Sequence, residues 1–243
     1  MENENGEWII HGVKMNDPNR IRNVEELEAY INKVGFLPLF ACDIPGFSVE
    51  ERTVAKYWWS GDAKNDPWEW RAIVARRGNI VYGKFFDKKA GFISKEWLPV
   101  FANFRRDGYD FDSLWDDQKA SARCKKIMDL FEDNEELYSY EVKEKAGFGK
   151  DGEKNFEGTI TSLQMMLYLC NKDFRQKINK KGEPYGWAVS VYTTPEKIWG
   201  RDDVTACYKE DPKDSWQKVC DYMRKMYPGV TDRQIKKNLW YKL

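Results

Sequence analysis

The stretch from residue 123 to residue 193 constrains the fold most, because apolar spacing and turn residues follow a definite order there. Apolar residues recur every three or four positions in three successive segments, and a Lys- and Gly-containing turn then separates two short strand patterns. We expect helices over Arg123–Glu132, Ser139–Gly147 and Thr159–Phe174, and strands over Arg175–Asn179 and Gly186–Tyr192. Three helices followed by a β-hairpin is the order of elements in a winged helix.

Charge is balanced over the whole chain but not locally. The 243 residues carry 40 Lys and Arg against 40 Asp and Glu, which disfavours a dedicated high-affinity nucleic-acid binder. Residues 129–136, however, contain five acids and no base, whereas residues 172–181 contain five bases against Asp173 alone. Any contact with an anionic partner is therefore expected around the second of these segments.

Cysteine usage and the N-terminus indicate the compartment. The five cysteines form no C-x-x-C pair and are odd in number, which favours free thiols in a reducing compartment. Residues 1–6 lack the basic and apolar regions of a signal peptide, and no apolar run approaches the roughly 18 residues of a membrane helix. We expect a cytoplasmic protein without a membrane partner.

The N-terminal half repeats the same general plan of helices and a hairpin. Asn23 and Asp66 are typical helix caps, the second followed by Pro67 at the first helical position. We expect helices over Asn23–Lys33, Pro67–Arg77 and Lys95–Arg106, a hairpin over Ile80–Phe86 and Ala90–Ile93, and an acidic bridge over Asp107–Asp117.

These patterns predict an α+β fold, mainly helical, made of tandem winged-helix-like units with a helical C-terminal extension. The extension contains the expected helices Asp214–Met226 and Asp232–Leu239. The predicted divisions are an N-terminal appendage over residues 1–22, a first unit over 23–117, a second unit over 118–195 and the extension over 196–243.

Two chemical motifs are set aside. Gly147–Gly152 matches G-x-G-x-x-G but follows a helix rather than a strand, which favours a helix–helix loop over a dinucleotide site. His11 is the sole histidine, so a structural zinc site or a His-dependent nucleophile is not expected. We therefore predict no metal and no cofactor.

Four tryptophans lie close together, at positions 58, 59, 68 and 70. Exposed aromatic rings can stack on nucleic-acid bases, at about 1–3 kcal/mol per base, although tryptophans in a small domain are more often core. Helical spacing favours an inward position for Trp70. Trp58 and Trp59 are adjacent and cannot both face the same way, so one of them is the better stacking candidate in a cleft.

The predicted second hairpin carries the strongest binding signal. Lysines at a hairpin tip can reach phosphates, and polar residues on an exposed helix face suit a nucleic-acid groove. Lysine is also a common means of keeping an edge hairpin soluble, so this interpretation stays open. The candidate nucleic-acid contacts are Thr161, Ser162, Gln164 and Lys172 on the exposed face of the third helix, and Arg175, Lys177, Lys180 and Lys181 in the hairpin.

Several segments share aromatic, Gly and Pro residues with one enzyme family. They are Val34–Phe40, Trp70–Gly83, Lys89–Ser94 and Trp97–Arg106. Together they resemble the opening winged-helix unit of the AlkZ-type DNA glycosylases, residues 123–193 resemble the second unit, and residues 216–239 resemble a shortened start of the third. Those bacterial enzymes unhook alkylated purines and interstrand crosslinks. Their C-terminal β-barrel is not expected here.

The resemblance fails at the catalytic motif. The glycosylases carry Gln-x-Gln or Gln-x-Asp directly after the first helix, where the polar pair positions and activates the attacking water. The equivalent positions here are Pro38, Leu39 and Phe40, none of which can accept a proton or orient water. Asp43, three residues further on, is the nearby carboxylate that could replace the motif.

The leading hypothesis is a winged-helix nucleic-acid-binding protein related to these glycosylases but without glycosylase activity, with DNA as the candidate partner. One alternative is a divergent glycosylase acting on alkylated or crosslinked bases through Asp43, with a tryptophan of the cluster as a wedge. A second alternative is a module that binds a protein or another non-nucleic-acid ligand. A cleft lined by acids around Arg71 and Lys84 would favour that module.

The replaced motif leads to a further prediction. Burial of a Phe side chain contributes about 1.5–3 kcal/mol, so Phe40 should be buried beside a closed or apolar pocket. Restoring the motif through Pro38→Gln and Phe40→Asp should then destabilise the protein, because unpaired polar groups would enter an apolar site. An open basic cleft lined by residues 38–43 would contradict this prediction.

Overall fold

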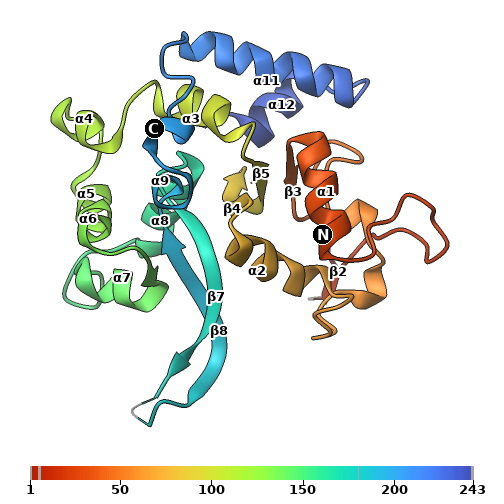
Figure 1. The fold of residues 1–243 in the computed structure, drawn as a ribbon, viewed down its shortest axis with the longest axis horizontal. Helices are drawn as coiled ribbons and strands as arrows, with labels where there is room; N and C mark the ends of the chain where they lie inside the picture. The colour runs from red at the N-terminus through yellow and green to blue at the C-terminus, as the bar shows by residue number, and fades with distance from the viewer. Residues whose placement is uncertain (1, 5–6, 180, 242–243) are drawn as a thin grey trace.

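The computed structural model describes residues 2–4, 7–179 and 181–241 of the chain. The helices are α1 (Val24–Val34), α2 (Pro67–Arg77), α3 (Leu98–Arg106), α4 (Phe111–Asp116), α5 (Ala122–Met128), α6 (Leu130–Asp133), α7 (Ser139–Lys145), α8 (Phe156–Met165), α9 (Pro195–Trp199), α10 (Arg201–Val204), α11 (Pro212–Met226) and α12 (Asp232–Leu239) (Figure 1). The strands are β1 (Glu2–Glu4), β2 (Glu7–Ile9), β3 (Phe36–Pro38), β4 (Ile80–Phe86), β5 (Lys89–Ser94), β6 (Leu137–Tyr138), β7 (Cys170–Ile178) and β8 (Pro184–Thr193).

Strands β3 to β8 form one antiparallel sheet in the order β3-β5-β4-β7-β8-β6. In the N-terminal half, the short strand β3 pairs with β5, the second strand of its hairpin. In the C-terminal half, β6 pairs with β8 in the same way. The halves join where β4 meets β7, at the residue pair Tyr82 and Asn171. The predicted α+β class is confirmed.

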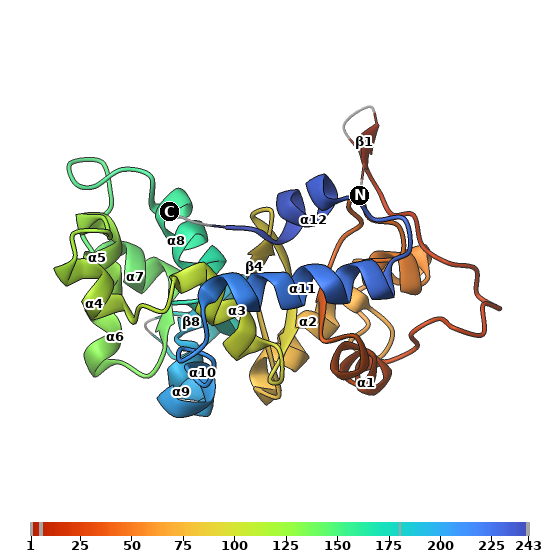
Figure 2. The ribbon, with the colours of Figure 1, turned by 90° about the horizontal axis from the view of Figure 1, so that it is seen from above.

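Two hydrophobic clusters pack beside this sheet. One contains side chains of α1, α2, α3 and strands β3 to β5, and the other contains side chains of α4 to α8 and β8. The C-terminal helices belong to the first cluster, through Val219 and Met223 of α11 and Ile235 and Leu239 of α12. Helix α11 runs alongside α3 (Figure 2). Helices α11 and α12 therefore complete the core around α1, α2 and α3.

Arg105 joins three parts of the fold that are distant in sequence. The side chain is 2% exposed and donates to the carbonyl oxygens of Phe85 (2.8 Å), Met165 (2.9 Å) and Leu239 (2.9 Å). Met165 and Leu239 are the last residues of α8 and α12, where carbonyls without an intrahelical partner favour a cation. Arg105 thereby holds the first hairpin, α8 and α12 together.

Local cap signals were accurate. Helix α2 spans Pro67–Arg77, and the side chain of Asp66 accepts from the backbone N–H of Trp68. Helix α12 spans Asp232–Leu239 behind the cap Thr231. The hairpin β4–β5 is also where the sequence predicts it. These elements depend on contacts within a few residues, which the sequence displays directly.

The prediction of a helix over Thr159–Phe174 is wrong at its C-terminal end. Helix α8 ends at Met165, Leu167 adopts a left-handed backbone conformation with φ 65°, and residues from Cys170 onward form β7. Every residue from 163 to 171 is buried. A short apolar run that is buried on all sides has no period that distinguishes helix from strand, so apparent helical spacing continued past the true end.

Other boundaries also differ from the predictions. The expected acidic bridge contains helix α4, because the side chain of Asp110 caps it by accepting from the backbone N–H of Ser113. The helix expected over Arg123–Glu132 is divided into α5 and α6. Helix α3 begins at Leu98 rather than Lys95, with Pro99 in its first turn, where proline is tolerated.

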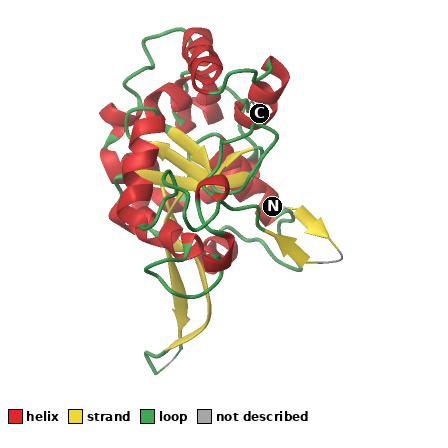
Figure 3. Ribbon diagram, turned by 90° about the vertical axis from the view of Figure 1, so that its right-hand side faces the viewer, coloured by secondary structure: helices red, strands yellow, loops and turns green. Residues whose placement is uncertain are grey.

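The hairpin β7–β8 extends well beyond the helices of the body (Figures 1 and 3). Its base is covered, since Val191, Tyr192 and Thr193 are buried, whereas residues 184–188 of β8 are exposed. The described residues around the tip form a turn closed by the backbone N–H of Asn179, which donates to the carbonyl of Glu183. The hairpin is therefore a feature of the surface rather than of the core.

Candidate functional site

A cleft of about 440 Å³ lies where the two halves of the sheet meet. Strands β4, β7 and β8 contribute to it, together with side chains of α2 and α8 and the segment after β3. It is thus lined by residues from both halves of the chain. The lining residues are Phe40, Trp68, Arg71, Tyr82, Gly83, Lys84, Ala90, Ser139, Glu157, Gln164, Asn171, Phe174, Ala188, Val189, Ser190 and Tyr192.

Arg71 of α2 is a buried cation on the wall of this cleft. The side chain is 8% exposed, and its guanidinium lies 3.5 Å from the ring centre of Trp68 and 4.3 Å from that of Phe174. One of its N–H groups donates to the backbone carbonyl of Trp68. Burial lowers the pKa of Arg71 against the opposing effects of Tyr82, Glu69 and Asp66, and within the described residues its guanidinium forms no ion pair with a carboxylate.

Tyr82 of β4 lies beside this guanidinium. Burial raises the pKa of Tyr82 to about 12, against the opposing effect of the positive charge on Arg71. The tyrosine therefore stays neutral at ordinary pH and does not neutralise the arginine. Glu69 and Asp66 act on the charge of Arg71 without forming an ion pair with it, so the buried guanidinium on this wall of the cleft still suits an anion.

Gln164 of α8 contributes a donor that lacks a partner. The side chain is 1% exposed, and its Oε1 accepts from the backbone N–H of Lys84 at 2.9 Å. Its Nε2 is buried and has no hydrogen-bond partner among the described residues. A Cβ at Gly83 would lie 3.0 Å from Oε1 of Gln164 and 2.7 Å from the ring of Phe85. Glycine at position 83 is therefore what lets the amide reach the strand.

Phe40 is half-buried and lines this open cleft, so the prediction of a buried Phe40 beside a closed or apolar pocket is wrong. Its ring lies 5.3 Å from the ring of Trp58 and 6.3 Å from that of Trp68. Pro38, in contrast, is buried within β3. The sequence did not reveal the partial exposure of Phe40 because α8, β7 and β8, which complete the cleft, are distant in the chain.

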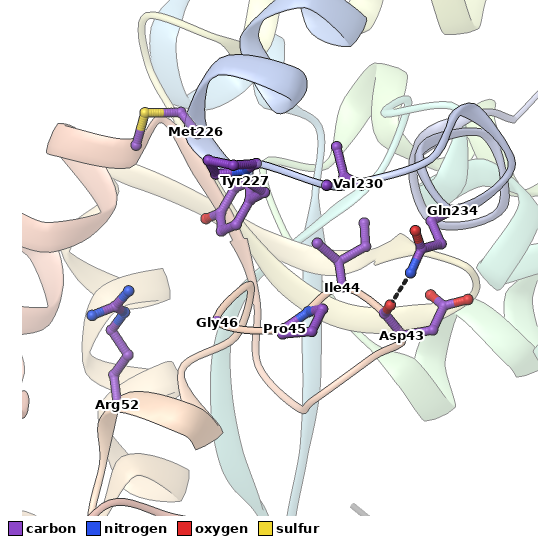
Figure 4. Close-up of a pocket in the computed structure, with 11 residues that line it drawn as sticks. Asp43, Ile44, Pro45, Gly46, Arg52, Met226, Tyr227, Val230 and Gln234 are labelled. Carbon is purple, nitrogen blue, oxygen red and sulfur yellow. Dashed lines mark hydrogen bonds between the residues drawn. The ribbon is translucent and has the colours of Figure 1, made fainter.

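Asp43 lies outside this cleft and contacts α12 instead. Its Oδ1 accepts from Asn238 at 2.6 Å, its Oδ2 accepts from Lys237 at 3.0 Å, and its backbone carbonyl accepts from Gln234 (Figure 4). Burial raises the pKa of Asp43, but the two side-chain hydrogen bonds outweigh it, and the pKa is lower than its ordinary value. The residue borders a separate cavity of about 490 Å³ between residues 43–46 and 226–234.

The two tryptophans proposed for stacking occupy different environments. Trp58 is 5% exposed and donates from Nε1 to the hydroxyl of Thr53 at 3.0 Å, whereas Trp59 is 46% exposed. Neither is among the lining residues of the cleft, although the ring of Trp58 lies beside that of Phe40. The tryptophan that does line it is Trp68, and Trp70 is in the core as expected.

The predicted exposed helix face is only partly present. Thr161 and Ser162 are half-buried on α8, and Ser162 accepts from the hydroxyl of Tyr241 at 3.0 Å. Gln164 was expected on this face and is buried instead, because it points toward β4. Lys172 was also expected there and lies half-buried on β7, since α8 ends before it.

The basic residues of the hairpin are not equivalent. Arg175 pairs with Glu136 and, at 2.7 Å, with Asp173, so its charge is neutralised. Lys177 lies 5.0 Å from the ring centre of Tyr140. Lys181 is exposed, and Lys180 lies outside the described residues. Toward the tip of the hairpin, Lys177 and Lys181 are therefore the described cations available to a partner.

The sequence analysis missed three apolar side chains on the same hairpin. Trp187 is 93% exposed, Ile178 53% and Tyr185 49%. The sequence signal for their exposure was a long strand pattern on both sides of a Lys-rich turn. No other described element covers the outer part of such a long hairpin. Exposed aromatic residues beside lysines are typical of an interaction surface.

Other chemistry finds little support in the described part of the chain. No cluster of three or more His, Cys, Asp or Glu side chains there is arranged to hold a metal ion. The glycine motif at 147–152 lies in the loop between α7 and α8, as expected. None of the described helices has the length and apolar character needed to cross a membrane.

Comparison with protein-family models gives one match, to the AlkZ-related family, over residues 21–240. The chain belongs to the AlkZ-related family. The match covers both halves of the sheet and both C-terminal helices, so it includes the whole cleft. Searches of curated proteins and of solved structures found no significant match. Membership relates the chain to the AlkZ-type DNA glycosylases, as the resemblance had implied.

Proposed function

We propose that this AlkZ-related chain is a nucleic-acid-binding protein built on two winged-helix-like units, over residues 23–117 and 118–195. The element order supports the proposal, because each half has a helix, a short strand, further helical segments and a hairpin. In each half the short strand pairs with the second strand of the hairpin, which is the connectivity of a winged helix. DNA is the candidate partner through the family relationship.

The hairpin β7–β8 carries the proposal. It projects from the body, presents Lys177 and Lys181, and exposes 93% of the Trp187 side chain (Figure 1). Lysines supply the sequence-independent attraction to phosphates, and an aromatic ring beside them can stack on a base or wedge into a groove. Burying these groups against nucleic acid accounts for a surface that would otherwise be unfavourable in water.

We also propose that the chain does not cleave the glycosidic bond. Positions 38–40 have no side chain that can orient water, and the carboxylate of Asp43 is bonded to α12 rather than directed into the cleft. The protein-binding alternative required an acidic cleft around Arg71 and Lys84. Those two bases and the acidic Glu157 all line the cleft, so its charge does not favour that alternative.

Fluorescence anisotropy with labelled intact, nicked and crosslinked duplexes at low salt tests binding. We expect dissociation constants below about 10 μM, where even non-specific binders register. The variant Lys177→Ala with Lys181→Ala should bind more weakly. The matched control, Lys88→Ala with Lys89→Ala at the turn and the start of β5, should bind as the parent does. Failure of every duplex to bind below that concentration would disprove the function.

A separate assay tests the absence of catalysis. Alkylated and crosslinked duplexes are incubated with the protein, and abasic sites are then cleaved and counted. We expect no product above the protein-free control. Product that disappears in Asp43→Asn would instead establish the divergent glycosylase.

A further inference from the structure

The buried cation and the donor without a partner line the same cavity. Arg71 belongs to α2 and Gln164 to α8, and both side chains line the cavity. The guanidinium forms no ion pair within the described residues, although the charges of Glu69 and Asp66 act on it, and the buried Nε2 of Gln164 has no acceptor there. Each group loses hydration without full replacement, which a ligand carrying an anion and a hydrogen-bond acceptor would reverse.

Aromatic side chains form the rest of the wall near Arg71. Phe40, Trp68 and Phe174 line the cavity, and the ring of Phe40 is only half-buried, although it lies near the rings of Trp58 and Trp68. Stacking on such a ring is tolerant of which base is present. The volume of about 440 Å³ lies within the usual range for sites that enclose a small ligand.

We propose that this cleft binds a single nucleotide, with its phosphate on Arg71, its base stacked on Phe40 and an acceptor of the base facing Nε2 of Gln164. The nucleotide is either free or an unpaired unit of a nucleic-acid strand. For the second source the inference rests on the proposed function. An aromatic ring at a position where the glycosylases carry a polar catalytic residue makes the cleft a site of recognition, in which a nucleotide is held and not cleaved.

The first test uses free ligands. Titrations of the full chain with nucleoside monophosphates, nucleosides and inorganic phosphate are followed by calorimetry. We expect the monophosphates to bind at least tenfold more tightly than nucleosides or inorganic phosphate, because the phosphate and base contacts act together. Phe40→Leu and Arg71→Met should each weaken monophosphate binding at least tenfold. Gln164→Met should weaken it less, because it removes one neutral donor.

Controls keep this test independent of folding. Trp59→Leu removes an exposed aromatic ring outside the cleft and should leave monophosphate binding unchanged. Each cleft variant is accepted only when its circular dichroism and melting temperature match those of the parent. Should Arg71→Met fail to fold, Phe40→Leu and Gln164→Met still decide the outcome. Binding that is unaffected in both would overturn the inference.

The second test compares a fully paired duplex with a duplex that carries one unpaired nucleotide. We expect the unpaired nucleotide to raise affinity at least tenfold, and Phe40→Leu to abolish that preference while leaving affinity for the paired duplex intact. Paired-duplex binding without any preference, together with no monophosphate binding, would overturn the inference and leave the proposed function standing. Monophosphate binding with no duplex binding would support the inference and refute the proposed function.

Discussion

The two hairpins of the sheet have similar sequence signatures and opposite surroundings. In β4 all residues but Lys84 are buried, and its connection to β5 is a tight turn at Asp87 and Lys88. In β8 the first five residues are exposed, and the hairpin extends past the helices (Figure 3). Both connections carry lysines. Lysine in a turn therefore does not reveal whether a hairpin belongs to the core or to an interaction surface.

The difference arises from what packs against each hairpin. Side chains of α1, α2, α3, α11 and α12 surround β4–β5, whereas α2, α7 and β6 cover only the base of β7–β8 among the described elements. Apolar residues of the first hairpin stabilise the fold, and those at the outer end of the second do not. This contrast can be tested by changing equivalent residue types in the two places.

The largest effect is expected from aromatic residues. Phe85→Ala in the first hairpin removes a fully buried ring and should lower the free energy of unfolding by about 3–5 kcal/mol. Trp187→Ala in the second removes a ring that is 93% exposed and should change it by less than about 0.5 kcal/mol. Urea unfolding measures both. Comparable decreases would show that the second hairpin is also part of the core.

The base of the second hairpin should be intermediate. Asp173 is 3% exposed and accepts from Arg76 of α2 at 3.1 Å and from Arg175 at 2.7 Å, so it links the halves. Asp173→Asn should lower the free energy of unfolding by about 1–3 kcal/mol at pH 7. Urea unfolding checks this value, and an unchanged midpoint would show that the link carries no stability.

The same residue gives a pH dependence. Burial raises the pKa of Asp173, but hydrogen bonds from Arg76 and Arg175 outweigh it and leave the pKa below its ordinary value. A carboxyl with a lowered folded pKa stabilises the fold above its unfolded pKa, and that stability disappears as the pH falls through the folded value. The difference between parent and Asp173→Asn, measured by urea unfolding at a series of pH values, should therefore shrink as the solution is acidified through that range.

The lysine pairs sharpen the comparison in binding rather than in stability. In a plot of log affinity against log salt, Lys177→Ala with Lys181→Ala should reduce the slope by about 0.9 for each phosphate that the variant no longer neutralises. Lys88→Ala with Lys89→Ala should leave the slope unchanged, because the first hairpin does not project. Equal reductions of the slope in both double variants would indicate that nucleic acid contacts both hairpins of the sheet.

A small effect is also expected at the contact between Asp43 and α12. Its partner Lys237 is 54% exposed at the side chain, and exposed pairs contribute at most about 1 kcal/mol. Asp43→Asn should thus lower stability by less than about 1 kcal/mol at pH 7. Because the pKa of Asp43 is below its ordinary value, that small difference should vanish in acid. A larger decrease, measured by thermal unfolding, would contradict an exposed contact.

Sequence alone could predict the elements that short-range contacts determine. Asp66 before Pro67 and Thr231 before Asp232 locate α2 and α12, since capping involves residues two or three positions apart. The same logic predicts the first hairpin from its alternating strands and turn. The end of α8 could not be found in this way, because pairing of Cys170 with Thr193 across 23 positions decides it.

The candidate site was less predictable than the fold. The sequence indicated Arg71 and Lys84 as possible cleft residues and Phe40 as a replaced catalytic position. It did not indicate that Gln164 of α8 is buried and lines the same cleft. That convergence depends on β4 meeting β7, a single pairing between the two halves. Exposure of Trp187 likewise depends on the absence of a neighbour from the described structure, which composition does not display.

Arg105 has a consequence for synthesis on the ribosome. Its acceptors are the carbonyls of residues 85, 165 and 239. The ribosome therefore adds Leu239 long after it has made the first hairpin, which Arg105 joins to α12. During translation, a nascent chain that has collapsed around α3 holds a guanidinium whose final acceptor does not yet exist. We expect the N-terminal half to remain incompletely folded until α12 emerges, which makes this chain a candidate for chaperone dependence during its synthesis.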